Sequence, residues 1–214
     1  MPKKLKTKHI YLISGILLVI FLSLIISLTG FRHYNQDSRA QELPLLLNSG
    51  LFDCQQATIK YILWTEESGK LSEIEEVLES SGLAWHKQVL SDFSGKKAYK
   101  YLNKAIIEKE DEGRALAFYN KLSERTSDLK VRVYFEEKVD AVLEPNCYLE
   151  KNKVKIVQTV QMPGIISLCG FHYDLPLTVK AGRKNINIQL VTKNEAGSNR
   201  GKTVLAFPAL LEEF

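Results

Sequence analysis

The stretch 185-NINIQLVTKNEAGSNRGKTVLAFPAL-210 contains two apolar segments separated by a polar one. Ile186, Ile188 and Leu190 alternate with polar residues, which is typical of a strand with one buried face. The polar residues that follow predict the turn of a β-hairpin. The segment 202–210 then predicts a final strand, which is interrupted by Pro208. We therefore expect paired strands near the end of the chain.

Within this stretch, AGSNRGKT (196–203) has the spacing of a loose phosphate-binding loop. Such a loop joins a strand to a helix, and the amides at the start of that helix hold the phosphates. A strand precedes the motif here, but residues 203–214 contain Pro208 and predict a strand instead of a helix. We therefore expect a hairpin turn and no bound nucleotide.

The segment 70–82, KLSEIEEVLESSG, predicts the clearest helix. Ser72 and Glu75 have the spacing of a capping box, in which side chains satisfy the open amides of the first turn. Gly82 is placed to end the helix. The apolar face consists of Ile74, Val77 and Leu78.

A second helix is predicted at residues 111–125, and residues 145–164 are ambiguous between helix and strand. In the second helix the residues that share one apolar face are Ala115, Phe118, Tyr119 and Leu122. Residues 54–68 and 128–139 alternate as half-buried strands do, and residues 83–93, 97–109 and 165–175 are also strand-like. This order of elements predicts an α+β fold, a curved antiparallel sheet with helices on one face, over residues 51–214.

The N-terminus predicts a membrane anchor. Residues 1–9 contain four lysines, and residues 10–31 contain no charge and are long enough to cross a bilayer as a helix. The positive-inside rule keeps the basic tail in the cytoplasm and places the bulk of the chain outside, after a linker at residues 32–50. A cleaved signal peptide with a small-x-small site at residues 38–40 is an alternative, as is a buried soluble helix.

The positive charge of the chain belongs to its N-terminus. Residues 1–40 carry a net charge of +5, so the remainder carries −1 of the total +4. A nucleic-acid-binding domain normally has a basic face of its own. The neutral average does not exclude such a patch, but it makes a nucleic-acid partner unlikely.

Cys54, Cys147 and Cys169 are too far apart in sequence for a CxxC metal or redox site. Outside the membrane, one pair could form a disulfide and leave an odd thiol. Alternatively, the cysteines are small buried apolar residues. The sequence does not choose between these states.

Candidate catalytic chemistry is confined to residues 169–174. His172 and Asp174 lie two apart and would share a face of an extended segment, as an oriented base requires. Cys169 lies three residues before His172, so a strand would point the two to opposite faces. The acidic run 108–113 lacks the spacing of a calcium loop and predicts the turn that starts a helix. We therefore expect no catalytic, metal or cofactor-binding residues, and no enzyme activity.

Two strands, at residues 61–64 and 131–135, are rich in aromatic side chains. Trp64 and Trp85 are predicted to be core or groove residues. A sheet that helices cover on one face leaves its other face available to a partner or ligand.

The segment 167–214 resembles the C-terminal part of the YwmB family of Gram-positive bacteria. The resemblance rests on a strand with a small-residue and aromatic step, an Asn-rich strand, a Gly-Lys-Thr turn and an acidic-aromatic end. The residues that carry it are Ser167, Gly170, Phe171, Asn185, Asn187, Gln189, Leu190, Pro208, Glu213 and Phe214. It implies a fold like that of the TATA-box-binding protein, a curved sheet built from two related halves. This family has no established activity, so no site residue is carried over.

These expectations together predict a membrane-anchored, extracytoplasmic binding module of the cell envelope. Its partner would be an envelope protein or another envelope component on the open sheet face or an edge strand. The alternatives are an envelope hydrolase that uses Cys169, His172 and Asp174, and a nucleic-acid-binding protein.

Overall fold

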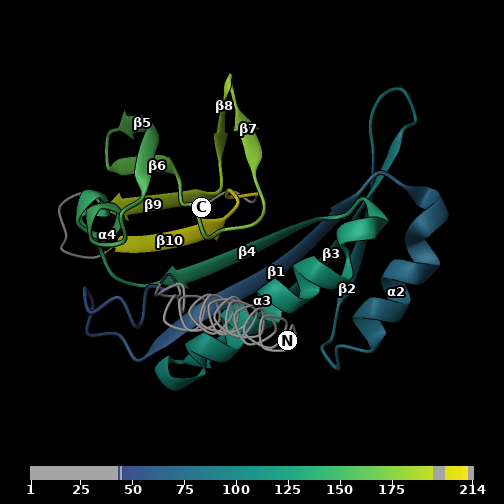
Figure 1. The fold of residues 1–214 in the computed structure, drawn as a ribbon, viewed down its shortest axis with the longest axis horizontal. Helices are drawn as coiled ribbons and strands as arrows, with labels where there is room; N and C mark the ends of the chain where they lie inside the picture. Colours follow the sequence, from purple (N-terminus) through teal and green to yellow (C-terminus); the bar gives the residue numbers. More distant parts are fainter. Residues whose placement is uncertain (1–42, 44, 195–200, 212–214) are drawn as a thin grey trace, which may run out of the picture. The chain divides into compact units, whose positions relative to one another are not determined.

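Eight strands form one antiparallel sheet in the order β2-β3-β1-β4-β10-β9-β6-β5 (Figure 1). The structure is a computed structural model, and it describes residues 43, 45–194 and 201–211. The strands of this sheet are β1 (Gln56–Thr65), β2 (His86–Ser91), β3 (Lys97–Glu108), β4 (Arg132–Val139), β5 (Lys155–Met162), β6 (Ile165–Phe171), β9 (Ile188–Asn194) and β10 (Gly201–Phe207). The expected α+β class with a large antiparallel sheet is confirmed.

A small hairpin, β7 (Val179–Ala181) and β8 (Lys184–Ile186), projects from the sheet (Figure 1). The sequence predicts one strand across 185–193, but Asn187 separates β8 from β9. The Asn187 amide donates to the carbonyls of His172 and Leu175, and its oxygen accepts from the His172 N–H. Asn187 is fully buried. Its side chain therefore fixes the loop that precedes β7, and this interrupts the strand.

The predicted hairpin near the end of the chain is confirmed for its strands, because β9 pairs with β10 in antiparallel register. Residues 196–200 of the motif lie outside the described residues. Gly201, Lys202 and Thr203 begin strand β10, not a helix. A Cβ at Gly201 would lie 2.3 Å from the Lys193 carbonyl oxygen, so the glycine permits a close backbone approach. The described residues of the motif, 201–203, are part of the sheet.

Three helices cover one face of the sheet: α2 (Leu71–Glu79), α3 (Glu112–Arg125) and α4 (Pro145–Lys151). Single-turn 3-10 helices lie at Ser68–Lys70, Lys109–Asp111 and Ser127–Leu129. The buried residues of all three α-helices belong to one hydrophobic cluster with alternate residues of the sheet. We call the opposite face, which no helix of the described residues covers, the open face.

The predicted capping box of α2 is wrong. The helix begins at Leu71, so Ser72 lies inside its first turn, and no side chain caps its start. The Glu75 carboxylate instead accepts hydrogen bonds from Lys87 and from the Tyr101 hydroxyl on neighbouring strands. Tertiary contacts to the sheet thus replace the local cap. The predicted apolar face is confirmed, since Ile74 and Leu78 are buried.

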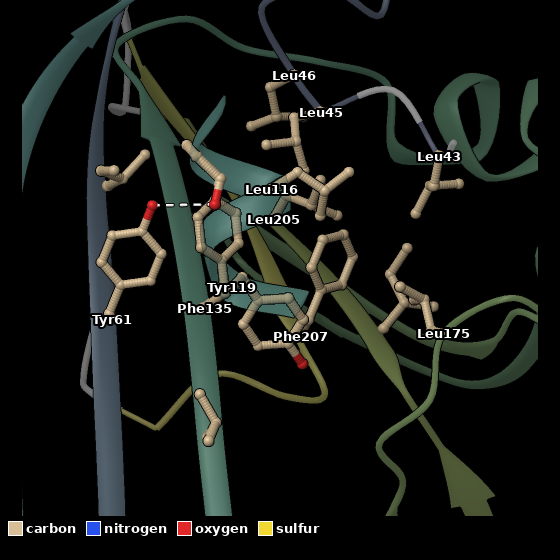
Figure 2. Packing of buried hydrophobic residues seen from close by; sticks show 14 of the residues in the cluster. Leu43, Leu45, Leu46, Tyr61, Leu116, Tyr119, Phe135, Leu175, Leu205 and Phe207 are labelled. Carbon is tan, nitrogen blue, oxygen red and sulfur yellow. Dashed lines mark hydrogen bonds between the residues drawn. The ribbon is translucent and has the colours of Figure 1, made fainter. Parts of the chain in front are cut away.

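Aromatic rings form the centre of the core between α3 and the sheet (Figure 2). The Phe135 ring stacks on Phe207 at 5.8 Å between centroids, and Tyr119 of α3 contacts both rings. The Tyr61 hydroxyl donates to the Ala115 carbonyl of α3 at 3.0 Å. These contacts join β1, β4 and β10 to one helix, because their side chains alternate toward α3.

The segment 145–164, which the sequence leaves ambiguous between helix and strand, contains the helix α4 followed by the strand β5. α4 begins with Pro145 in its first turn, where a missing amide costs nothing. Tyr148 and Leu149 of this helix are fully buried, and α4 packs on β6 and β9. Lys153 then turns the chain with φ at 53°, and β5 pairs with β6.

Residues that the sequence analysis assigns to the linker belong to the core. Leu43 and Leu45 are buried, and Leu46 and Leu47 are fully buried in the cluster under α3 (Figure 2). The apolar run Leu45–Leu47 is short and has no periodicity, so the sequence alone does not distinguish it from a linker. The domain therefore begins before residue 51.

No helix within residues 43, 45–194 and 201–211 is long and apolar enough to span a membrane. The expected anchor at residues 10–31 lies outside the described residues, as do the basic tail and most of the linker.

Candidate functional site

Five adjacent strands, β3, β1, β4, β10 and β9, place lysines side by side on the open face, and β3 contributes Lys100 there as well as Lys104. Lys60 of β1 lies directly opposite Lys104 of β3. Lys138 of β4 pairs with Val204 of β10, two residues from Lys202, and Lys202 lies directly opposite Lys193 of β9. Side chains two apart on a strand share a face, so the five lysines form one stripe. The lysine stripe consists of Lys104, Lys60, Lys138, Lys202 and Lys193.

Two pairs in the lysine stripe are like-charge pairs in direct register, Lys60 with Lys104 and Lys202 with Lys193. Like charges directly opposite each other destabilise a sheet. Among the described residues, no carboxylate forms an ion pair with Lys104, Lys138 or Lys202. The stripe therefore carries net positive charge that the described residues do not neutralise.

The lysine stripe surrounds a hollow of about 160 Å³ in the open face. Its wall comes from β3, β1, β4 and β10 and from the segment that follows β10. The residues that line the hollow are Thr58, Lys60, Lys104, Glu136, Lys138, Lys202, Val204 and Leu210. Four of the five stripe lysines therefore converge on one small space.

Among the described residues, Glu136 is the single carboxylate that lines the hollow, and it is almost fully buried. One of its oxygens lies 3.3 Å from the Lys60 ammonium, and the other accepts the Leu211 amide at 3.2 Å. The Leu210 amide donates to Gln189, which also lies on the open face. Glu136 thus neutralises one lysine and holds the chain after β10 at the edge of the hollow.

The lysine stripe and the acidic helix α2 lie on opposite faces of the sheet. The helix α2 alone contains Glu73, Glu75, Glu76 and Glu79. On the open face, Glu108 and Asp140 accompany Glu136, but Glu108 lies at a strand end and Asp140 follows one. The near-neutral charge of residues 41–214 therefore conceals a basic stripe on the open face, which the sequence does not reveal.

Aromatic residues of the open face lie away from the lysine stripe. Trp64 pairs with Lys100 and Arg132, four residues along β1 from Lys60. Tyr134 pairs with Ile62 and is buried. Trp85 is a helix-side residue, half-buried, whose indole N–H donates to the Ser81 hydroxyl. The side chains next to the stripe are aliphatic or small, such as Ile106 and Val204.

A second ionisable cluster, which the sequence analysis missed, lies on the helix side. Glu112 and Glu137 are both buried, although the acidic run 108–113 predicts a solvated turn. Glu137 accepts the Leu46 amide, and Glu112 accepts the amides of Leu47 and Asn48. These two carboxyl groups fix the start of the domain to α3 and β4.

Burial, followed by the hydrogen bond and the charge of Glu112, raises the pKa of Glu137 well above its usual range. Burial and both carboxylates raise the pKa of the nearby Tyr148 hydroxyl as well. In the described residues, the Oε1 atom of Glu137 is buried and no group donates a hydrogen bond to it. The cluster has a structural task, because it is enclosed and faces backbone amides.

The candidate hydrolase residues do not form a triad. The His172 ring nitrogen Nδ1 lies 3.9 Å from Asp174 and accepts the Asp174 backbone amide at 3.3 Å. Cys169 is buried, and burial raises the pKa of its thiol, which disfavours the thiolate. In the described part of the chain no hydrogen bond joins Cys169 to His172. The arrangement therefore does not support the hydrolase alternative.

The three cysteines are free thiols on different elements. Cys54 is half-buried, Cys147 of α4 is exposed and Cys169 of β6 is buried. Of the three, Cys169 alone is the small buried apolar residue that the sequence offered as one alternative. No group of three His, Cys, Asp or Glu side chains in the described residues could hold a metal ion.

The residues that carry the family resemblance have structural tasks here. A Cβ at Gly170 would lie 2.4 Å from a Val154 methyl group, so a larger residue would not fit between β5 and β9. Gln189 donates to the Ser167 hydroxyl and accepts the Leu210 amide. Together with Asn187, these contacts fix the loops and the end of the chain around the sheet.

No protein-family model matches the chain, and no curated protein matches it. Among solved structures, the chain is similar to the ligand-free regulatory subunit of aspartate kinase from Thermus thermophilus, with 8% sequence identity and a TM-score of 0.21. The alignment covers 73% of this chain and 84% of that subunit. The regulatory subunit of aspartate kinase from Thermus flavus covers the same shares, with 9% identity and a TM-score of 0.22. Similarity this weak carries no argument about function.

Proposed function

We propose that this chain is a membrane-anchored, extracytoplasmic binding module of the cell envelope, and that its open face binds an acidic envelope component. The observation that carries the proposal is the lysine stripe. A fold gains nothing from like-charge pairs in register, so their presence on the uncovered face favours a ligand of opposite charge.

The location is part of the proposal and rests on the sequence. Residues 10–31 are uncharged and follow a lysine-rich tail, which supports an anchor with the domain outside. A saddle-shaped sheet of the TATA-box-binding-protein kind, in a YwmB-like chain, is also part of the proposal. The ligand surface would then be the concave side of the saddle.

Labelling of the exposed Cys147 with a membrane-impermeant maleimide tests the location. We expect the full-length protein on intact, wall-stripped cells to be labelled without lysis, and Cys147→Ser to remove most of the label. Labelling that requires lysis would contradict an extracytoplasmic domain.

Retention of the full-length protein on purified envelope material tests the binding face. We expect the triple variant Lys104→Gln, Lys138→Gln, Lys202→Gln to be retained far less than the parent. A matched triple variant, Lys121→Gln, Lys180→Gln, Lys184→Gln, changes the net charge equally on exposed residues outside the open face. Equal loss in both triple variants would mean that overall charge, and not the open face, causes retention.

A further inference from the structure

We infer that the open face recognises a linear phosphate polymer, one phosphate group of which occupies the hollow between Lys104, Lys138 and Lys202. This inference rests on the proposed function, because it names the chemistry of the acidic component. It follows from the size of the hollow, the type of its cations, the shape of the stripe and the residues beside it.

The hollow has room for one anionic group and not for a whole small molecule. Its volume of about 160 Å³ is well below the roughly 300–1,000 Å³ of typical small-molecule sites. An occupant of this size is one group of a larger ligand. The rest of that ligand lies on the open face.

The cations around the hollow favour phosphate over carboxylate. All of them are lysines, which act as point charges with three donors each, whereas arginine is the residue that matches a planar carboxylate in a bidentate pair. Arg132 of the open face does not line the hollow. A tetrahedral phosphate can accept hydrogen bonds from several directions at once, as three convergent lysines require.

The stripe has the shape of a chain-binding site. It crosses five neighbouring strands, so its ends are separated by roughly 19 Å at a strand spacing of about 4.8 Å. One cation on each strand presents positive charge at a regular interval. A ligand with regularly repeated negative charge neutralises the whole stripe, including both like-charge pairs.

The residues next to the stripe disfavour nucleic acid as that chain. Single-stranded nucleic acids bind to grooves in which aromatic side chains stack on successive bases. Trp64 lies four residues from Lys60 along β1, which is about 13 Å, and the immediate neighbours of the stripe are aliphatic. The surface therefore suits a phosphate backbone without bases.

Glu136 is a positioning residue in this site. It accepts the Leu211 amide and pairs with Lys60, so it orients both but also places one negative charge beside the phosphate. Glu136→Gln retains an acceptor for the amide and removes that charge. The inference therefore predicts that this substitution strengthens binding, which is the opposite of what removal of a ligand-contacting residue does.

The test uses the full-length protein in uncharged detergent micelles, with long-chain inorganic polyphosphate as the immobilised probe. We expect salt-dependent binding, a loss of at least tenfold in affinity in the triple variant Lys104→Gln, Lys138→Gln, Lys202→Gln, and little change in the matched triple variant at Lys121, Lys180 and Lys184. Glu136→Gln is expected to bind roughly three- to tenfold more tightly. Glu73→Gln, on the exposed side of α2, gives the same charge change and no gain.

The competitors distinguish failure of this inference from failure of the proposed function. Poly-glutamate that competes as well as polyphosphate, and depends on the same lysines, overturns phosphate recognition but retains an acidic ligand on the open face. Equal competition by single-stranded DNA or by vesicles of anionic lipid overturns the phosphate polymer in favour of those ligands. Absence of lysine-dependent binding to any of these polyanions overturns the proposed function itself. Circular dichroism of each variant confirms that it is folded.

Discussion

Glu112 and Glu137 are both buried and bind consecutive backbone amides, Glu137 accepting the Leu46 amide and Glu112 the amides of Leu47 and Asn48. Glu112 begins α3 and Glu137 lies in β4, so the pair joins a helix, the sheet and the first described residues.

Glu137→Gln is expected to change how stability depends on pH. The pKa of Glu137 is raised in the folded state, so folding favours its protonated form. The parent protein then loses stability as pH rises above the unfolded glutamate pKa of about 4.3, up to the raised folded value. The glutamine variant resembles the protonated state and lacks this loss. Urea unfolding of the full-length protein in uncharged detergent, over a series of pH values, measures the difference.

Glu73→Gln is the control for this prediction, because Glu73 is exposed and forms a surface ion pair with Lys70. The free energy of unfolding of Glu137→Gln should fall less steeply with pH than that of the parent or the control. Parallel curves for all three proteins would show that Glu137 does not titrate with folding.

Gly201→Ala is expected to destabilise the domain by about 1–3 kcal/mol, as overpacking of a tight site does. The added methyl group would meet the Lys193 carbonyl oxygen at 2.3 Å and a Val142 methyl group at 2.5 Å. Gly113→Ala is the matched control, since nothing lies within 4 Å of a Cβ there. In α3, alanine should instead stabilise by about 0.5–1 kcal/mol. Thermal or urea unfolding that shows the same sign for both variants would contradict the close approach at Gly201.

Thr203→Val should cost about 1–3 kcal/mol, because it leaves buried polar groups unsatisfied. The Thr203 hydroxyl donates to the Ala141 carbonyl at 2.8 Å and accepts the Leu143 amide at 3.1 Å. Thr159→Val, on the exposed edge strand β5, is the comparison. Hydrogen exchange at the Leu143 amide should accelerate only in Thr203→Val. If the two variants unfold alike, the hydroxyl of the Gly-Lys-Thr sequence has no such structural task.

The sequence predicted correctly those strands and helices whose structure depends mainly on the pattern of apolar residues within the element itself. Alternation identified β1, β3, β4 and β10, and the apolar face of α3 was read correctly because Ala115, Tyr119 and Leu122 repeat at helical spacing. Long-range contacts decided the rest. The capping box failed because Glu75 bonds to Lys87 and Tyr101, and the burial of Glu112 depends on amides more than sixty residues away.

The candidate site could not be read from the sequence for a related reason. Each lysine of the stripe is an ordinary polar position on the exposed side of its strand. Only the register of five strands, from Lys60 to Lys202, shows that they are neighbours. The net charge of the domain averages these lysines with the glutamates of α2 and therefore does not show them.

Lysine footprinting tests the central claim, a polyanion on the open face, most directly. The full-length protein is acetylated with a water-soluble ester, with and without polyphosphate, and each lysine is quantified by mass spectrometry. We predict protection of Lys104, Lys138, Lys193 and Lys202, with Lys121 of α3 and Lys180 of β7 modified equally in both samples. Uniform protection of all lysines, or protection on the helix side alone, would contradict the account.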